Sequence, residues 1–333
     1  LPAAGWTGEQ DWIGWAAFET LPAEFDPPTG VLANANNRVA GRDPTLYLGR
    51  EFDAPYRARR IVDRLAAAVP DASVASMAAL QMDTLSLFAR DLVPILIARI
   101  ERLVPDAATA TALELLLDWD GDMAADRPEP VIFAAWIAAL HDRLLGDDLG
   151  PLLPQYRRIR AATLIRILTA EPHWCDDRQT PTEETCRDLV AGSLSEALAE
   201  TTRKLGPDIA GWRWGEAHQA VFEHRIWHRI PILGGLLERR APTGGGDYTV
   251  SRGSWTVGED PAFRHGHGAG LRVVYDLADL DLSRFVAALG PSGNPFSPYH
   301  DTWHQAWSQG DTFTTPRQPD LVRSRLVLVP SDS

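Results

Sequence analysis

The most constraining feature of this sequence is that its character changes twice along the chain. Apolar side chains recur at helical spacing throughout residues 53–211. The flanking residues 1–52 and 212–333 are instead rich in Gly, Pro, Asn and aromatic side chains. These changes predict three parts: a layer of strands and loops at 1–52 that contains the asparagine run, a helical lobe at 53–211, and a β-rich C-terminal part at 212–333. The expected fold class is α+β, with a large helical insertion between sheet-forming ends.

The apolar spacing predicts several helices within residues 53–211. The first begins where Asp53 can cap and Pro55 can occupy the first turn. A second contains Pro94, which favours a kink. The helical segments are 53–69, 85–96, 131–145, 156–168 and 182–204. The β-type stretches of the C-terminal part are 248–250, 271–275 and 326–329.

The overall charge and the apolar runs exclude two classes of partner. Lys and Arg number 32 against 45 Asp and Glu, which gives a net charge of −13 and disfavours nucleic-acid binding. The longest apolar runs, such as 92–98, are far shorter than the roughly 20 residues of a membrane helix. No signal peptide is visible at the start of the chain, and we expect one in an upstream part.

Cys175 and Cys186 are the only cysteines. A local disulfide in a secreted protein is the favoured interpretation, and two free buried thiols are the alternative. A zinc site that adds His173 is a more remote possibility, because the close ligand pairs of a zinc clip are absent.

Other polar clusters match functional templates only in part. Asp118, Asp120, Asp122 and Glu129 have calcium-loop order, but Met123 stands where the template needs Gly, so an acidic loop between helices is expected. His265 and His267 lack further ligands and indicate a Gly-rich surface loop. The segments 244–247 and 297–301 are expected to be turns. We therefore predict no metal site.

An asparagine run, ANANNR at 33–38, follows a Pro-Pro-Thr-Gly turn. Asparagine favours turns over strands, so three in four positions predict a kinked segment whose amides have defined hydrogen bonds. One interpretation is a turn that satisfies its own backbone. The other is an oxyanion site, because a carboxamide can donate to a carbonyl oxygen that becomes negative, contributing roughly 3 to 4 kcal/mol to transition-state stabilisation.

Several blocks, in order, resemble the β-subunit of the penicillin acylase (penicillin amidase) family of N-terminal nucleophile hydrolases. They are PPTGVLANANNR, REFDAPYRARRI and ALGPSGNPFSPYHDTWHQAWSQGDTF, supported by GWTGEQDWIGW, LLLDWDGDM, HWCDDRQTPTEETC and GGGDYTV. The resemblance covers nearly the whole chain. It implies a four-layer αββα sandwich, present here in part.

The resemblance also implies an amidase that releases a carboxylic acid and an amine. In that family a precursor cuts itself, and the newly exposed Ser, Thr or Cys attacks the acyl carbon with its own α-amine as base. The family's oxyanion asparagine matches Asn36, with Asn34 and Asn37 as supports. The family's arginine near the active site matches Arg57, for which a helix-surface arginine is the alternative.

The nucleophile has no match in this chain. Residues 1 and 2 are Leu and Pro, and the Gly-Ser pairs ending at Ser193 and Ser254 follow the asparagine run instead of preceding it. We expect the chain to need an α-subunit and the N-terminal part of the β-subunit, and to be inactive alone. The alternative is a catalytically inactive interaction or structural module derived from the family.

The resemblance implies an acylated small-molecule substrate, with penicillins and acyl-homoserine lactones among the family's substrates, and a periplasmic or extracellular location. No cofactor is expected in this chain. Calcium is possible in the complete enzyme, where Asp43 is a weak candidate ligand.

Overall fold

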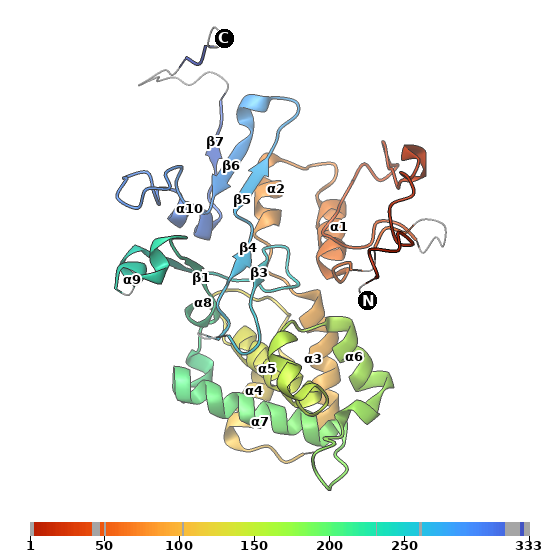
Figure 1. Ribbon diagram of the computed structural model, residues 1–333. Coiled ribbons are helices and arrows are strands. Elements are labelled where there is room, and N and C mark those ends of the chain that lie inside the picture. The colour runs from red at the N-terminus through yellow and green to blue at the C-terminus, as the bar shows by residue number, and fades with distance from the viewer. Residues whose placement is uncertain are drawn as a thin grey trace.

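The computed structural model describes residues 3–41, 47–49, 51–101, 103–230, 232–259, 262–316 and 327–329. Helices α3 to α7 gather at one end of the molecule, and the small sheets lie at the other (Figure 1). The helices are α1 Tyr56–Ala68, α2 Val74–Gln81, α3 Leu87–Ile100, α4 Ala107–Leu117, α5 Glu129–Leu149, α6 Ala161–Ala170, α7 Cys186–Leu205, α8 Trp214–Ala217, α9 Leu233–Leu237 and α10 His304–Gln309. No helix in these ranges is long and apolar enough to cross a bilayer.

The helical lobe is built around α5, most of whose residues are buried. Val131, Ile132 and Trp136 are fully enclosed, which removes their apolar surface from water. The indole Nε1 of Trp136 donates to the Val190 carbonyl at 3.1 Å and lies 3.2 Å from the Ser193 hydroxyl, so α5 is joined to α7. Helices α5 and α7 therefore pack directly against each other in the interior of the protein.

The helix starts differ from those predicted. Asp53 does not cap α1, whose N-cap is Pro55, because the Asp53 carboxylate is paired with Arg57 instead. The helix expected from residue 156 begins at Ala161, after a 3-10 turn. The last long helix starts at Cys186, because Thr185 forms a capping box with Asp188.

The C-terminal part contains small antiparallel sheets. Their strands are β1 Gln219–Phe222 with β2 Arg239–Pro242, β3 Gly253–Ser254 with β4 His267–Gly268, and β5 Leu271–Val274, β6 Arg284–Ala287 and β7 Phe313–Thr314 in that order. The strand predicted at 271–275 is confirmed. Residues 248–250 form a turn instead, because the Thr249 hydroxyl bonds to the carbonyls of Gly246 and Ser251. Residues 327–329 have no regular structure, and Leu326 is outside the described residues.

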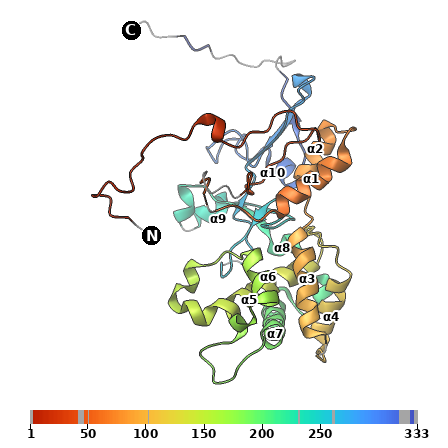
Figure 2. The same cartoon turned by 90° about the vertical axis from the view of Figure 1, so that its right-hand side faces the viewer.

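The N-terminal part has no strand in its described residues, so the prediction of short strands there is wrong. Apart from a 3-10 turn at Phe18–Thr20 it is irregular. A strand needs a neighbour for its backbone groups, and no neighbouring strand lies beside this segment in the described residues. The red N-terminal segment runs away from the rest of the molecule (Figure 2).

The two cysteines form a disulfide, as favoured from the sequence. It joins the 3-10 turn Pro172–Cys175 to the first residue of α7. The alternatives of free thiols and a zinc site are thereby excluded for this pair, because a disulfide sulfur has no thiolate to offer a metal.

The acidic segment predicted to be a loop does connect α4 with α5. Three of its carboxylates have protein partners: Arg127 lies 2.8 Å from Asp120 and 3.0 Å from Glu129, and Thr84 donates to Asp122. No group of three or more potential metal ligands occurs in the described ranges. Asp43 lies outside the described residues.

The other polar clusters have structural partners. His300 and Asp301 belong to a packed turn, where they bond to the Ser292 carbonyl and to Arg239. His265 does not lie in a surface loop as predicted: it is buried, bonded to Thr243 and stacked on His218. The neutral imidazole can be buried because its ring is apolar once its N–H is bonded.

Candidate active site

The asparagine run forms a tight turn held by its own side chains. The Asn34 Oδ1 accepts from the Asn36 amide at 3.0 Å, and the Asn37 Oδ1 accepts from the Ala35 amide at 3.1 Å. Asn36 itself has a left-handed backbone with φ 62°, a conformation that Asn tolerates better than most residues. Asn34 and Asn37 therefore hold the turn, and Asn36 stands at its apex.

Arg57, in the first turn of α1, fixes this turn to the helical lobe. Its Nη2 lies 2.8 Å from the Ala35 carbonyl, 2.8 Å from the Asn36 Oδ1 and 2.7 Å from the Asp53 Oδ2. The Asp53 amide also donates to the Asn36 carbonyl at 2.9 Å. One guanidinium nitrogen thus orients the asparagine turn, and the alternative of a free helix-surface arginine does not describe Arg57.

These contacts decide how the Asn36 carboxamide is oriented. A guanidinium can only donate hydrogen bonds, so the atom that faces Arg57 must be the amide oxygen. The amide nitrogen, Nδ2, consequently points elsewhere and has no hydrogen-bond partner among the described residues. Because Asn36 is exposed, this N–H group can reach a ligand.

A second arginine shapes the charge around the site. Arg252 lies 3.5 Å from Asp53 and 3.9 Å from Asp247. Burial and the neighbouring Arg252 charge lower the pKa of Arg57, while the Asp53 carboxylate opposes this. Burial raises the pKa of Asp247. Two guanidinium groups and two carboxylates therefore balance one another beside Asn36.

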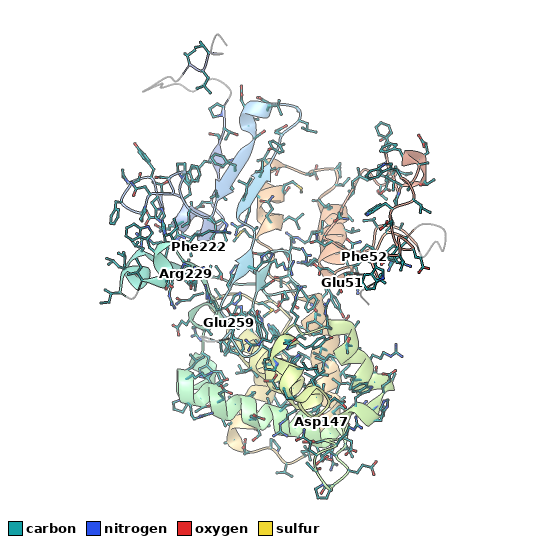
Figure 3. The ribbon with its side chains drawn as sticks, in the orientation of Figure 1. Glu51, Phe52, Asp147, Phe222, Arg229 and Glu259 are labelled. Carbon is teal, nitrogen blue, oxygen red and sulfur yellow. A yellow bond between two sulfur atoms is a disulfide. The ribbon has the colours of Figure 1, made fainter. Side chains whose placement is uncertain are left out.

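A cavity of about 480 Å³ opens beside these charges. Its walls come from the segment before α1, from the start of α6 and from residues 247–252. Glu51 and Phe52, which line it, lie next to α1 (Figure 3). On the far wall the Tyr248 hydroxyl donates to the Ile159 carbonyl at 2.7 Å, which ties the two parts of the chain together. The cavity is large enough for a small organic ligand.

The structure brings Asn34, Asn36, Asn37 and Arg57 together. Of the two Gly-Ser serines, Ser193 lies in the helical core, whereas Ser254 contacts Arg252 of the neighbouring charge cluster. Ser193 is fully buried in α7, and Ser254 accepts from the Arg252 Nε at 2.8 Å in β3. Sequence reasoning missed Asp53 and Arg252. The i, i+4 spacing of Asp53 and Arg57 was a readable signal, whereas the role of Arg252 depends on a contact across about two hundred residues.

Comparison with known proteins shows to which family the chain belongs. The model of the family described as penicillin amidase matches residues 1–324. The chain belongs to the penicillin amidase family.

Within the penicillin amidase family, the chain is similar to penicillin acylase 2 proenzyme of Pseudomonas sp. (strain SE83), at 33% identity over 92% of this chain and 39% of that protein. It is also similar to the acyl-homoserine lactone acylase QuiP of Pseudomonas syringae pv. tomato, at 28% identity over 99% of this chain and 43% of that protein. It therefore spans about two-fifths of these relatives.

The fold agrees with this family. A thermostable penicillin G acylase from Alcaligenes faecalis matches with a TM-score of 0.59 and 18% identity, over 97% of this chain and 61% of that one. The expected α+β fold of the N-terminal nucleophile hydrolases is thereby confirmed.

Proposed function

We propose that this chain is part of a penicillin acylase-like amidase in which Asn36 stabilises the oxyanion. The supporting observation is the Asn36 carboxamide, whose oxygen accepts from Arg57 at 2.8 Å while its nitrogen is left available. A donor held in place before the reaction needs no reorganisation as charge develops, which is the usual source of oxyanion stabilisation.

In the proposed reaction, a nucleophile supplied from outside this chain attacks the acyl carbon of a linear amide. The carbonyl π electrons move to oxygen, and the Asn36 Nδ2–H donates to that oxyanion. The hydroxyl or thiol proton of that nucleophile passes to its own α-amine. When the C–N bond breaks, the α-amine gives this proton to the leaving amine, and an acyl-enzyme remains. Water then attacks the ester or thioester through a second oxyanion at the same donor, and the carboxylic acid is released.

The role proposed for Arg57 is positioning. It holds the Asn36 oxygen, so the amide nitrogen faces the reacting carbonyl. Asn34 and Asn37 support the turn through their contacts with the backbone of Asn36 and Ala35. None of these three residues needs to exchange a proton with the substrate.

The proposed context follows the relatives. We assign an N-acylated small molecule as substrate, an α-subunit and the N-terminal part of the β-subunit as partners, and a periplasmic or extracellular location. We assign neither nucleic acid nor membrane as a partner. The names penicillin acylase and acyl-homoserine lactone acylase indicate an N-acyl amide as the shared bond class.

The test uses the assembled acylase with two substitutions at residue 36. Asn36→Asp keeps the shape but removes the donor, and Asn36→Gly removes the side chain while tolerating the left-handed backbone. We expect both to lower kcat roughly 100- to 1000-fold. Asn294→Asp, in an exposed turn where Oδ1 accepts from Phe296 N, is the matched control. Turnover close to that of the unchanged enzyme in both Asn36 variants would remove Asn36 from the role.

A further inference from the structure

A second cavity, of about 380 Å³, lies between α2, β5 and the segment 243–252. Helix α2 lies beside β5 at the sheet end of the molecule (Figure 1), and the Gln81 side chain at the end of α2 donates to the Val273 carbonyl of β5 at 2.9 Å. The residues that line this cavity include Arg252, His265 and Arg272 but no Asp or Glu. Its charge is therefore positive.

Arg272 is the source of this charge. Its residue is 9% exposed, and no carboxylate pairs with it among the described residues. Its Nη1 donates to the Trp307 carbonyl at 2.7 Å, and its guanidinium carbon lies 4.8 Å from the centre of the Trp307 ring. Burial lowers the pKa of Arg272 to about 10, so it is still charged at neutral pH. A buried charge without a counterion is costly, and an anion would relieve that cost.

The neighbouring groups do not supply the missing negative charge. Thr243 donates its hydroxyl proton to the His218 carbonyl, so its oxygen must accept from the His265 Nδ1–H. Burial, followed by the neighbouring Arg272 charge, lowers the pKa of His265 to about 4, so His265 is neutral at pH 7. Arg252 already shares the carboxylates of Asp53 and Asp247. One positive charge, that of Arg272, is thus left uncompensated, which matches a monoanion.

The remaining walls are partly apolar. Met82, Val250, Ala269, Leu271 and Val273 line the cavity next to the polar groups. A cavity of this volume holds a small organic molecule, and apolar walls favour one with a hydrocarbon part. An inorganic ion would leave these walls in contact with water.

We propose that this cavity binds a small organic monocarboxylate. The carboxylate pairs with the guanidinium of Arg272, and the hydrocarbon part packs against Met82 and Val273. The site does not use Asn36 or Arg57, so it stands independently of the proposed acylase activity.

The test compares benzoate with benzamide, its uncharged analogue, by isothermal titration calorimetry on the full chain at constant ionic strength. We expect benzoate to bind at least about tenfold more tightly, because hydrogen bonds to charged groups contribute that much. Arg272→Met should lower the benzoate affinity by about tenfold or more. Arg284→Met, an exposed arginine on the neighbouring strand β6, should leave it unchanged.

Equal binding of the two compounds, or full benzoate affinity in Arg272→Met, would overturn the proposal. A second measurement covers the case in which Arg272→Met does not fold. An intermolecular NOE, measured by NMR on the unchanged chain, should connect the assigned methyl groups of Met82 and Val273 with the benzoate ring. Its absence while benzoate binds would place the ligand elsewhere and also contradict the site.

Discussion

At the scale of single residues, one guanidinium nitrogen links the asparagine turn to the helical lobe. Arg57 contacts Ala35, Asn36 and Asp53 while its side chain is only 13% exposed. Removal of a mostly buried donor leaves several acceptors without a partner, and that loss is larger than the loss of an exposed ion pair. The position of the carboxamide therefore depends on a residue that lies 21 positions further along the chain.

We expect Arg57→Met to lower the free energy of unfolding by about 1 to 3 kcal/mol, because Asp53 and the turn carbonyls lose their donor. Arg59→Met, at an exposed position of the same helix, should change it by less than about 0.5 kcal/mol. Urea denaturation of the two variants measures the difference. Similar losses in both would mean that the contacts of Arg57 contribute nothing specific.

At the scale of elements, the short ladder of β3 and β4 covers a stack of aromatic rings. Trp214 stacks on His218 at 4.4 Å between ring centres, and His218 stacks on His265 at 5.1 Å. Gly253 and Gly268 face each other in the ladder. A Cβ on Gly253 would lie 2.4 Å from the His218 Nε2, so only glycine allows the strand to approach the rings this closely.

Gly253→Ala should therefore destabilise the protein by about 1 to 3 kcal/mol through overpacking. Gly266→Ala is the matched control, because a Cβ there would meet nothing within 4 Å. Thermal unfolding of both variants tests this expectation. A melting temperature of Gly253→Ala equal to that of the control would show that the rings can move aside at no cost.

The buried histidines should make stability depend on pH. Burial, and then the neighbouring His265, lower the pKa of His218 to about 3. Burial, and then Arg272 and His267, lower the pKa of His265 to about 4. The unfolded chain binds protons at an ordinary pKa of about 6.5, so the contribution to stability is complete above that pH and is lost as the pH falls towards 4.

The expected slope is about 1.4 kcal/mol per pH unit for each histidine below pH 6. The free energy of unfolding, obtained from urea denaturation at pH 7.5, 6 and 5, gives this slope. His218→Leu should reduce it by about half, and His173→Leu, at an exposed site, should leave it unchanged. An equal slope in His218→Leu would assign the acid sensitivity to other groups.

At the scale of the whole molecule, the two hydrophobic cores of the described residues differ in size. The larger core fills the helical lobe and extends to Trp255 and Val257, whereas the core of the small sheets contains Ala220, Val286 and Trp307. The N-terminal segment joins neither of them. Trp6, Trp12, Trp15 and Phe25 are all at least 90% exposed, which is an unusual amount of exposed aromatic surface.

We expect this chain by itself to associate through that aromatic surface, because its burial removes apolar area from water. Sedimentation velocity should show an average mass that rises with concentration. A variant with serine at residues 6, 12, 15 and 25 should stay closer to the monomer mass, whereas Tyr275→Ser with Leu277→Ser, at other exposed positions, should not. A monomer at all concentrations would contradict the expectation.

The sequence by itself identified the family and several helical segments and favoured the disulfide, because ordered sequence blocks, helical spacing and a lone cysteine pair are local signals. It also singled out Asn36 and Arg57, although their catalytic roles stay predictions. Only the tertiary structure showed that Arg57 donates to the Asn36 oxygen, that Arg252 pairs with Asp53 beside it, and that His265 is buried. These three features depend on contacts between segments that are distant in the sequence. The glycine-rich pattern around His265 could not reveal its burial, because an exposed loop and a strand packed on histidine rings can have the same local sequence.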